Sequence, residues 1–367
     1  MRVKLTEICT PKQWKTIPAN ELLDKGYPVY GANGIIGYYN EYNHENPVVA
    51  ITCRGATCGT INITVPQSYV TGNAMCLDDT RSDILPEYLY YCLLHYDFNN
   101  VISGSAQPQI TRQGLEKVEI KYYPIEAQKK IVAILSKTRA VITAHHQQLQ
   151  KLDELVKARF VELFGDMFLN FEEWNEAPLE SLADIVSGIT KGRKVSEKHL
   201  IKVPYMAVSN VKEGYIDWTT VKTIEATEQE INQYRLLPDD VLMTEGGDPD
   251  KLGRGAIIKT PLENCIHQNH IFRVRLDETH ILPVYFAEYL QHQRAKRYFL
   301  GCAKQTTGIA SINMKQLRAL PVLVPPLKLQ ERFAAFVEQT DKSKTAVQKA
   351  LDEAQLLFDS LMQKYFG

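Results

Sequence analysis

The segment PIEAQKKIVAIL at residues 124–135 returns, in altered form, as PLKLQERFAAFV at residues 326–337. The match extends without a gap over residues 105–165 and 307–367, at a constant offset of 202. The identical pairs include Pro124/Pro326, Gln128/Gln330, Ala133/Ala335, Thr138/Thr340, Thr143/Thr345, Ala144/Ala346, Leu149/Leu351, Leu155/Leu357, Phe164/Phe366 and Gly165/Gly367. An internal repeat of this length is stronger evidence of architecture than any local motif. It predicts two similar halves, each a globular segment followed by a long helix.

Each predicted helix begins at proline and ends before glycine, residues that suit the first helical turn and the residue after the last. Between these limits, apolar and small residues alternate at spacings of three and four. In the first helix they are Ile131, Leu135, Thr138, Ile142, His145, Leu149, Leu152, Val156 and Leu163, with a break at Arg159; in the second they are Phe333, Val337, Thr340, Lys344, Val347, Leu351, Ala354, Phe358, Leu361 and Tyr365. A seam of about five heptads is typical of a helix that packs along its length on another. We interpret His145 as a seam residue and not as a ligand.

The globular segments show short apolar runs separated by glycines, which favours mixed strand and loop. Examples are residues 47–52 and 60–65, and a short helix is expected after Pro86. The predicted fold class is α+β: two similar mixed α/β domains, with helices paired antiparallel about a pseudo-twofold axis. The expected boundaries are a first domain at 1–123, a helix at 124–165, a linker at 166–176, a second domain at 177–324 and a helix at 325–367.

Composition is that of an ordinary globular protein, with 44% hydrophobic and 23% charged residues. No apolar run approaches the roughly 18 residues of a membrane span, and the first residues do not resemble a signal peptide. We therefore expect a cytoplasmic protein. Its seven cysteines are scattered, which favours reduced and mostly buried thiols. Cys53 and Cys58 lack a second cysteine or histidine pair at zinc-site spacing, so no metal site is predicted.

The net charge of −1 argues against a protein that holds DNA alone by neutralising phosphates. Residues 125–165 carry seven basic and four acidic side chains, whereas the globular segments are slightly acidic. Because released counterions supply most sequence-independent affinity, DNA binding would need local basic patches or a positively charged partner.

Two segments carry a resemblance to a known family: SGSAQPQITRQGLEKVEIKYYPIEAQKKIVAIL at 103–135 and KQTTGIASINMKQLRALPVLVPPLKLQERFAAF at 304–336. Each has a polar loop, a strand, a proline turn and a glutamine-containing helix start. The pattern resembles the specificity (S) subunits of type I restriction–modification enzymes, and it covers nearly the whole chain. YPVYGANGIIGYY at 27–39 and CRGATCGTINIT at 53–64 look like the family's target-recognition domains. The weak charge, and the absence of Gln-Pro-Gln from the second loop, depart from the pattern.

The resemblance implies that each domain reads one half of a bipartite double-stranded DNA target. The helices would space the domains and dock two methyltransferase subunits, which restriction and translocase subunits then join. S-adenosylmethionine and ATP with magnesium are expected only in those partners, and no cofactor is expected in this chain. The partner would methylate an adenine in each half-site, flipped out of the duplex. Half-site centres are expected about one helical turn, or about 10 bp, apart or somewhat more.

Motifs for catalysis are absent from the sequence. There is no phosphate-binding G-x-x-x-x-G-K-[ST] loop and no Asn/Asp-Pro-Pro-aromatic tetrapeptide. Glu245, Asp248 and Asp250 lie close together around glycines, which suggests a turn more than a nuclease centre. We therefore predict a non-catalytic subunit. A protein–protein scaffold with two binding domains is the alternative, which the near-neutral charge would suit, and a free-standing nuclease is a third possibility.

Base edges in DNA are read mainly by Arg and Lys on guanine and by Asn and Gln on adenine, presented from loops. The candidates by this rule are Tyr30, Asn33, Arg54, Gln107, Gln109 and Arg112 in the first half, and Lys191, Arg193, Lys194, Asn210, Lys251, Arg254, Lys304 and Gln305 in the second. Each could equally be a solvated surface residue. Arg294, Lys296 and Arg297 indicate a basic helix face that could contact phosphate. Because the candidates differ between halves, the predicted target is asymmetric.

Overall fold

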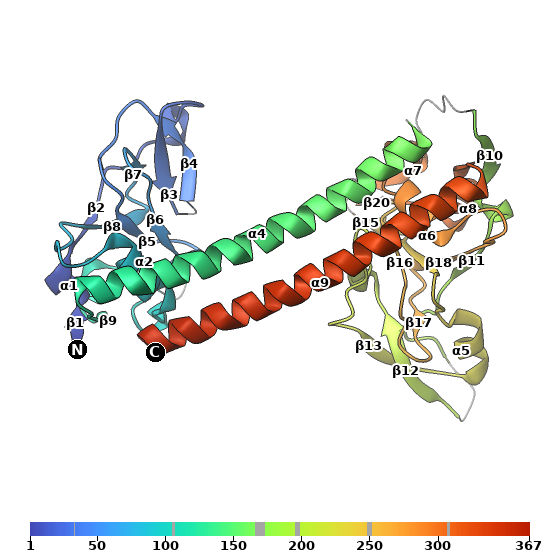
Figure 1. The fold of residues 1–367 in the computed structure, drawn as a ribbon. Helices are drawn as coiled ribbons and strands as arrows, with labels where there is room; N and C mark the ends of the chain where they lie inside the picture. Colours follow the sequence, from blue (N-terminus) through green and yellow to red (C-terminus); the bar gives the residue numbers. More distant parts are fainter. Residues whose placement is uncertain (33, 105–106, 166–172, 195–198, 248–251, 307–308) are drawn as a thin grey trace. The chain divides into compact units, whose positions relative to one another are not determined.

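The structure is a computed structural model, and it describes residues 1–367 except 33, 105–106, 166–172, 195–198, 248–251 and 307–308. The chain forms two compact units (Figure 1). Unit 1 comprises residues 1–147 and 347–367, and unit 2 comprises residues 148–346. These units differ from the predicted boundaries because each long helix is divided between both of them. In addition, strand β10 (Asn175–Pro178) begins inside the segment predicted as a linker.

Unit 1 is built on a four-stranded antiparallel sheet with the order β2-β8-β5-β6 and a three-stranded sheet with the order β4-β3-β7. The strands of these sheets are β2 (Thr10–Gln13), β3 (Tyr27–Gly31), β4 (Gly34–Tyr39), β5 (Val49–Thr52), β6 (Ile61–Ile63), β7 (Tyr69–Val70) and β8 (Ala74–Asp78). The remaining elements are the paired β1 (Arg2–Lys4) and β9 (Glu119–Lys121), with α1 (Leu5–Ile8), η1 (Ala19–Glu21), α2 (Pro86–His95), η2 (Phe98–Asn100) and α3 (Arg112–Leu115). The short helix expected after Pro86 is confirmed as α2.

Unit 2 repeats both sheets in the same strand order, β11-β18-β14-β16 and β13-β12-β17. Its strands are β11 (Ala183–Ser187), β12 (Ile201–Met206), β13 (Lys222–Ala226), β14 (Val241–Thr244), β16 (Gly255–Ile257), β17 (Ile266–His267), β18 (Ile271–Leu276), and β21 (Pro321–Val324) paired with β10. Its helices are η3 (Leu179–Ser181), η4 (Val208–Asn210), α5 (Glu228–Tyr234), α6 (Pro283–Tyr289), α7 (Gln293–Cys302) and α8 (Met314–Arg318). A further sheet joins β15 (Gly246–Gly247), β20 (Ile309–Ser311) and β19 (Lys304–Thr306). The predicted likeness of the two halves is confirmed.

The two long helices are α4 (Ile125–Phe164) and α9 (Leu327–Phe366). In unit 1, Leu135 near the start of α4 shares a core with Phe358 and Met362 near the end of α9. In unit 2, Phe160 at the end of α4 shares a core with Phe333 at the start of α9. The helices therefore run antiparallel, as predicted (Figure 1).

The repeated glutamines join the first turn of each long helix to the backbone around it. Gln128 and Gln330 are fully buried, and each makes the same three hydrogen bonds to backbone groups. The side-chain oxygen accepts from an N–H ahead of the short helix, and the amide nitrogen donates to two carbonyls. For Gln128 these groups belong to Leu85, Asp83 and Tyr123, and for Gln330 to Leu282, His280 and Pro325. Each glutamine thus satisfies backbone groups that would otherwise be buried without partners.

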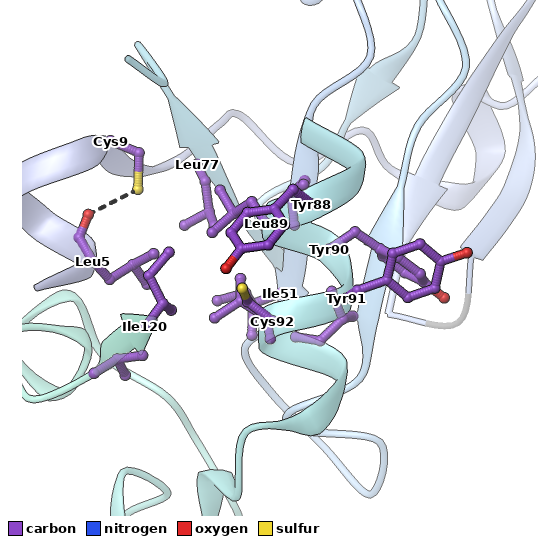
Figure 2. Packing of buried hydrophobic residues seen from close by; sticks show 14 of the residues in the cluster. Leu5, Cys9, Ile51, Leu77, Tyr88, Leu89, Tyr90, Tyr91, Cys92 and Ile120 are labelled. Atoms are coloured by element: carbon purple, nitrogen blue, oxygen red, sulfur yellow. Dashed lines mark hydrogen bonds between the residues drawn. The ribbon is translucent and has the colours of Figure 1, made fainter. Parts of the chain in front are cut away.

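The core of unit 1 forms where α2 packs on the sheet. Figure 2 shows Tyr88, Leu89 and Cys92 of this helix among Ile51 and Leu77 of the strands. The Tyr88 hydroxyl donates to the carbonyl of Lys121 at 2.7 Å, and in unit 2 the hydroxyl of Tyr285 donates to Leu323 at 2.8 Å. The same residue type therefore joins the short helix to the strand before the long helix in both units.

All seven cysteines are free thiols, and the expectation that most are buried is confirmed. Burial raises the pKa of Cys9 and of Cys92 to about 12, which keeps both thiols protonated. Among the described residues, no helix combines the length and apolar character needed to cross a membrane.

Candidate nucleic-acid interface

Three of the predicted DNA-contacting residues in unit 1 meet at one place. Arg54, Gln109 and Arg112 line an open pocket of about 440 Å³. They come from the end of the β5 strand, the loop before α3 and the first residue of α3. Lys12 and Gln13 of β2 line the same pocket, although the sequence analysis did not select them. The structure therefore gathers basic and amide side chains from segments about 100 residues apart in the chain.

The backbone beneath Arg54 and Gln109 is fixed by hydrogen bonds. These two residues face each other in an antiparallel bridge. On either side of them, Ile110 N–H donates to the Cys53 carbonyl at 3.0 Å, and Gly55 N–H donates to the Pro108 carbonyl at 3.2 Å. Because Arg54 and Gln109 face each other, their side chains project from the same face of the short ladder. Because the hydrogen bonds are made by the residues on either side, the two Cα atoms have the shorter of the two distances found in antiparallel pairs.

Lys12 is positioned by an aromatic ring. Its Nζ lies 3.7 Å from the ring centroid of Trp14, a favourable place for a cation. The Trp14 indole N–H donates to Asp78 at 3.1 Å, and the other oxygen of Asp78 lies 2.9 Å from His44 Nε2. The alternation of lysine and tryptophan in TPKQW at residues 10–14 placed both on one side of an extended chain, which is the signal that would have indicated Lys12.

The other unit 1 candidates occupy different environments. Tyr30 is only 7% exposed within the core beneath the sheet, and its hydroxyl accepts from Val65 N–H at 3.3 Å. This places Tyr30 in the scaffold and away from a base-reading surface. Gln107 is exposed, in a loop whose ends, Ser103 and Gln109, exchange two backbone hydrogen bonds. Asn33 lies outside the described residues.

In unit 2, two candidates also serve the scaffold. Asn210 is fully buried: its oxygen accepts from Ala207 N–H, and its amide donates to Asp217 and Thr220. Sequence reasoning could not separate this buried asparagine from a surface one, because both occur in polar turns. Thus Asn210 closes a turn and presents no free edge to a ligand.

Arg193 is likewise engaged within unit 2. It forms an ion pair of 2.5 Å with Glu230, and it also donates to the Glu225 carbonyl at 3.1 Å. Glu230 belongs to a capping box with Thr227 at the start of α5. The hydrogen bond from Arg193 is the largest cause that holds the pKa of Glu230 below its ordinary value. Arg193 therefore stabilises a helix start, whereas its neighbours Lys191 and Lys194 are exposed.

The remaining described candidates of unit 2 lie in two places, the segment before β16 and strand β19. Arg254 lines a small pocket with Glu213 and Lys296, and its Nε is buried without a hydrogen-bond partner. Lys304 and Gln305 belong to β19, where they pair with Ser311 and Ala310 of β20. Lys251 lies outside the described residues. On the basic face of α7, Lys296 pairs with Glu213 at 2.8 Å and Arg294 pairs with Glu176.

The long polar residues that line the unit 1 pocket are replaced by different ones at the equivalent, described positions of unit 2. Strand pairing shows which positions of the two units are equivalent. Arg54 faces Gln109 in unit 1, and Gly246 faces Ser311 in the same way in unit 2. The Ile110-to-Cys53 hydrogen bond recurs as Ile312 to Glu245, at 2.8 Å. The equivalent pairs around the pocket are Lys12/Val186, Gln13/Ser187, Arg54/Gly246, Gln109/Ser311 and Arg112/Met314. Every long polar side chain in unit 1 is thus replaced by a small or apolar residue.

Two other clusters contain side chains that could bind a metal ion or catalyse a reaction. His44, Cys76 and Asp78 place one ligand atom each within 4.8 Å of one another. The two ring nitrogens of His44 already contact Asn43 and Asp78, at 2.6 Å and 2.9 Å, so this group forms a hydrogen-bonded chain.

The second cluster is the acidic turn considered for a nuclease. Its Glu245 has a carboxylate oxygen 2.6 Å from His270 Nδ1, within hydrogen-bond distance. Asp248 and Asp250 lie outside the described residues.

The family comparison agrees with this architecture. The family model described as "Type I restriction modification DNA specificity domain" matches residues 1–154 and again residues 171–355. The chain belongs to this family. Its two matches coincide with the two halves that the internal repeat predicts. The resemblance to specificity subunits that the sequence indicated is thereby confirmed.

Relatives within the family are distant in sequence. The chain is 26% identical to the putative MjaX specificity subunit of Methanocaldococcus jannaschii, over 53% of this chain and 46% of that protein. It is 23% identical to the EcoKI specificity subunit of Escherichia coli K12, over 78% of this chain and 65% of that one. The chain therefore spans about half to two thirds of the length of these two curated relatives. A putative specificity subunit of Haemophilus influenzae, S.HindORF215P, is 23% identical over 96% and 89% of the two chains.

Solved structures share the fold. The S subunit of a type I restriction–modification system from M. genitalium superposes with a TM-score of 0.63 at 15% identity, covering 100% of this chain and 96% of that one. A chain from a structure of complex assembly in the type I R-M system gives a TM-score of 0.56 at 15% identity, covering 100% and 97%. At this identity the likeness supports the two-unit fold with paired long helices.

Proposed function

We propose that this chain is the DNA-specificity subunit of a type I restriction–modification complex, reading a bipartite and asymmetric target. The main observation behind the proposal is that the two units have the same buried scaffold but different surface residues. The buried glutamines and tyrosines recur in both units, whereas the five positions around the unit 1 pocket all differ. Two domains with one fold and different surface chemistry would recognise two different half-sites.

The surface chemistry of unit 1 suits DNA. Lys12, Arg54 and Arg112 supply positive charge at one site, and Gln109 supplies an amide that can pair with a base edge. The chain as a whole has a net charge of −1, so its own phosphate contacts would give limited affinity. Tight binding would therefore depend on the methyltransferase subunits bound beside it.

The long helices are the proposed docking surface for those subunits. In unit 1, Ile134 and Val141 of α4 and Leu356 and Leu357 of α9 expose between 41% and 69% of their surface. Apolar side chains on an otherwise polar helix face gain stability when a partner covers them. The methyltransferases would supply S-adenosylmethionine and the catalytic residues, so this chain would position the reaction without catalysing it. Restriction subunits with ATP and magnesium would join through them.

The experiment is to express the chain with the methyltransferase encoded beside it and to sequence the host DNA for methylated adenines. We expect one bipartite asymmetric motif, with half-site centres separated by about one helical turn. The matched control expresses the methyltransferase alone, which should leave the motif unmethylated.

The result also separates this function from its alternative. A soluble complex that shows no sequence-dependent methylation or DNA binding would refute the proposal. It would favour a protein–protein scaffold in its place.

A further inference from the structure

Arg54 and Gln109 form a pair suited to reading two adjacent bases. In an antiparallel ladder, two facing residues can be bonded not to each other but through the residues on either side. The Cα atoms of such a pair lie about 4.5 Å apart. Successive base pairs of DNA are spaced by about 3.4 Å along the helix axis. Two such side chains on one face can therefore address neighbouring base pairs. Arginine pairs bidentately with guanine and glutamine with adenine, both in the major groove.

The pair is held rigidly by its own backbone. Gln109 exchanges hydrogen bonds of 2.8 Å and 2.9 Å with Ser103, while the flanking bonds to Cys53 and Gly55 hold the Arg54 segment. The next residue, Ile110, is buried in the core. A fixed backbone lowers the conformational cost of presenting a side chain, and it keeps the donors in register.

The surroundings of the pair favour an anionic ligand. The pocket that contains it is lined by the cations of Lys12 and Arg112 as well as Arg54, and none of its lining residues is acidic. The Lys12 ammonium is kept in place by the Trp14 ring. These two flanking cations are placed to hold phosphates while the central pair contacts bases.

Unit 2 cannot offer the same contact. Its equivalent pair is Gly246 and Ser311. A Cβ atom at Gly246 would lie 2.8 Å from the Ala310 carbonyl oxygen and 3.1 Å from the Ser311 Cβ, so no longer side chain fits there without a backbone shift. The pair is therefore not repeated at the equivalent, described positions of unit 2.

We infer that Arg54 and Gln109 are the specificity-determining residues for two adjacent base pairs in the first half-site. Arg54 binds a guanine and Gln109 binds a neighbouring adenine. Lys12 and Arg112 contact the flanking phosphates. The inference rests on the proposed function, since it assigns part of the DNA target to one place on unit 1.

The test uses the complex of the full chain with its methyltransferase and duplexes randomised across the first half-site. Arg54→Ala should reduce the preference for one G·C pair by roughly ten- to hundred-fold, and Gln109→Ala should do the same for an adjacent A·T pair. Preferences in the second half-site should stay unchanged. Arg54→Lys keeps the charge and can still donate to guanine but lacks the planar fork of arginine, so it should lose only part of this preference.

Two further variants serve as controls. Ser311→Ala alters the equivalent position of unit 2 and should leave the first half-site unaffected. Lys12→Ala should weaken binding to all sequences equally and reduce the dependence of log affinity on log salt by about 1.

Three outcomes would overturn the inference. Arg54→Ala could weaken all sequences uniformly with a smaller salt dependence, which would make it a phosphate contact. The two affected positions could be separated by other base pairs, or selectivity could remain that of the unaltered chain. These results differ from failure of the proposed function, in which the unaltered complex itself would show no sequence preference.

Discussion

Units 1 and 2 share the hydrogen bonds of their buried glutamines and of Tyr88 and Tyr285, but they differ in the aromatic rings that close their cores. In unit 2, Phe164 lies in a group of four rings with Phe160, Phe333 and Tyr285, in which the centroids of neighbouring rings are 4.9 to 5.7 Å apart. A fifth ring, Tyr289, has its centroid 6.1 Å from that of Tyr285. By the offset of 202, the equivalent positions in unit 1 hold Phe366, Met362 and Ile131 beside Tyr88. The hydrogen bonds of these glutamines and tyrosines thus recur in both units, whereas the apolar packing beside them varies while the fold remains.

Buried polar, buried apolar and surface positions differ in how strongly the fold limits the residue type that they accept. A buried glutamine with three backbone partners has no simple substitute, because any apolar replacement leaves those partners without hydrogen bonds. An apolar site accepts several residue types of suitable volume. A surface position is constrained only by its ligand, and there the units diverge completely at the unit 1 pocket. The following predictions test these three levels of constraint, from the largest effect to the smallest.

The largest effect should come from the aromatic residue that ends each long helix. Phe164 is 1% exposed, and its three ring neighbours have centroids 4.9 to 5.7 Å from its own, whereas Phe366 is 8% exposed and its ring neighbours Tyr88, His95 and Tyr365 lie 5.6 to 6.4 Å away. Phe164→Ala should cost about 4 kcal/mol of stability and Phe366→Ala about 3 kcal/mol. Urea unfolding, followed by hydrogen exchange in peptides from each unit, measures both values. Phe→Leu variants are the matched controls and should each cost less than about 1.5 kcal/mol. Equal losses at both alanine sites would contradict the proposed difference in packing.

A pH effect of intermediate size should separate the units. His267 of β17 is buried, and desolvation lowers its pKa to about 4, although the Val186 and Tyr234 carbonyls near its ring nitrogens favour the charged form. The position equivalent to His267 in unit 1 is Val70. Below the ordinary pKa of 6.5, the unfolded chain binds a proton that the folded unit does not. The stability of unit 2 should therefore not depend on His267 protonation above pH 6.5. As the pH falls from 6.5 towards 4, the free energy of unfolding should decrease by about 3 kcal/mol through this residue.

The measurement is hydrogen exchange in each unit between pH 7 and pH 4, corrected for the intrinsic exchange rate. His267→Val copies the unit 1 residue and should remove this part of the pH dependence from unit 2. If unit 2 retains the full loss in that variant, the dependence arises from other groups.

The smallest effect should come from Arg193, and it separates stability from DNA affinity. Arg193→Ala should cost about 1 kcal/mol, because its partner Glu230 keeps the bond to Thr227 N–H at 2.9 Å. Because the pKa of Glu230 is lowered in the folded protein, its carboxylate stabilises the fold fully above pH 4.5, the ordinary pKa of glutamate. This stabilisation is lost as the pH falls through the lower pKa of the folded state. The cost of Arg193→Ala should therefore shrink in acid, as measured by thermal unfolding.

The neighbours of Arg193 provide the comparison. Lys191→Ala with Lys194→Ala should leave stability unchanged and weaken DNA binding of the methyltransferase complex with a smaller salt dependence. Weaker DNA binding from Arg193→Ala in a fully folded complex would contradict the assignment of Arg193 to the helix start.

Much of the fold could be predicted from the sequence because its signals are periodic or repeated. The offset of 202 and the heptad spacing identified both long helices, and proline and glycine marked ends within one residue of α4 and α9. The division of each helix between two units could not be predicted in this way. It depends on which core each half of the helix enters, and spacing along one chain does not carry that information. The seam prediction also missed Phe160, which packs inward beside the break at Arg159.

The candidate site was predicted less completely. Arg54, Gln109 and Arg112 were selected for residue type and loop context, and the structure brings them together. Tyr30 and Asn210 were selected by the same rule but are buried, because residue type does not report exposure. Lys12 was missed because it lies on strand β2, far along the chain from Arg54, Gln109 and Arg112, and only the fold brings it to the same pocket. Whether any of these residues contacts DNA remains a prediction.

The division of the helices also bears on synthesis at the ribosome. Unit 2 is one uninterrupted stretch, residues 148–346, so every part of it can be present before translation reaches residue 347. Unit 1 begins earlier in the chain than unit 2 but includes residues 347–367. Its nascent core must wait, with Leu135 and Tyr88 uncovered, until Phe358, Met362 and Phe366 emerge. Domains commonly fold in the order in which they are made. In this chain the order is reversed, and the domain that is started first is completed last.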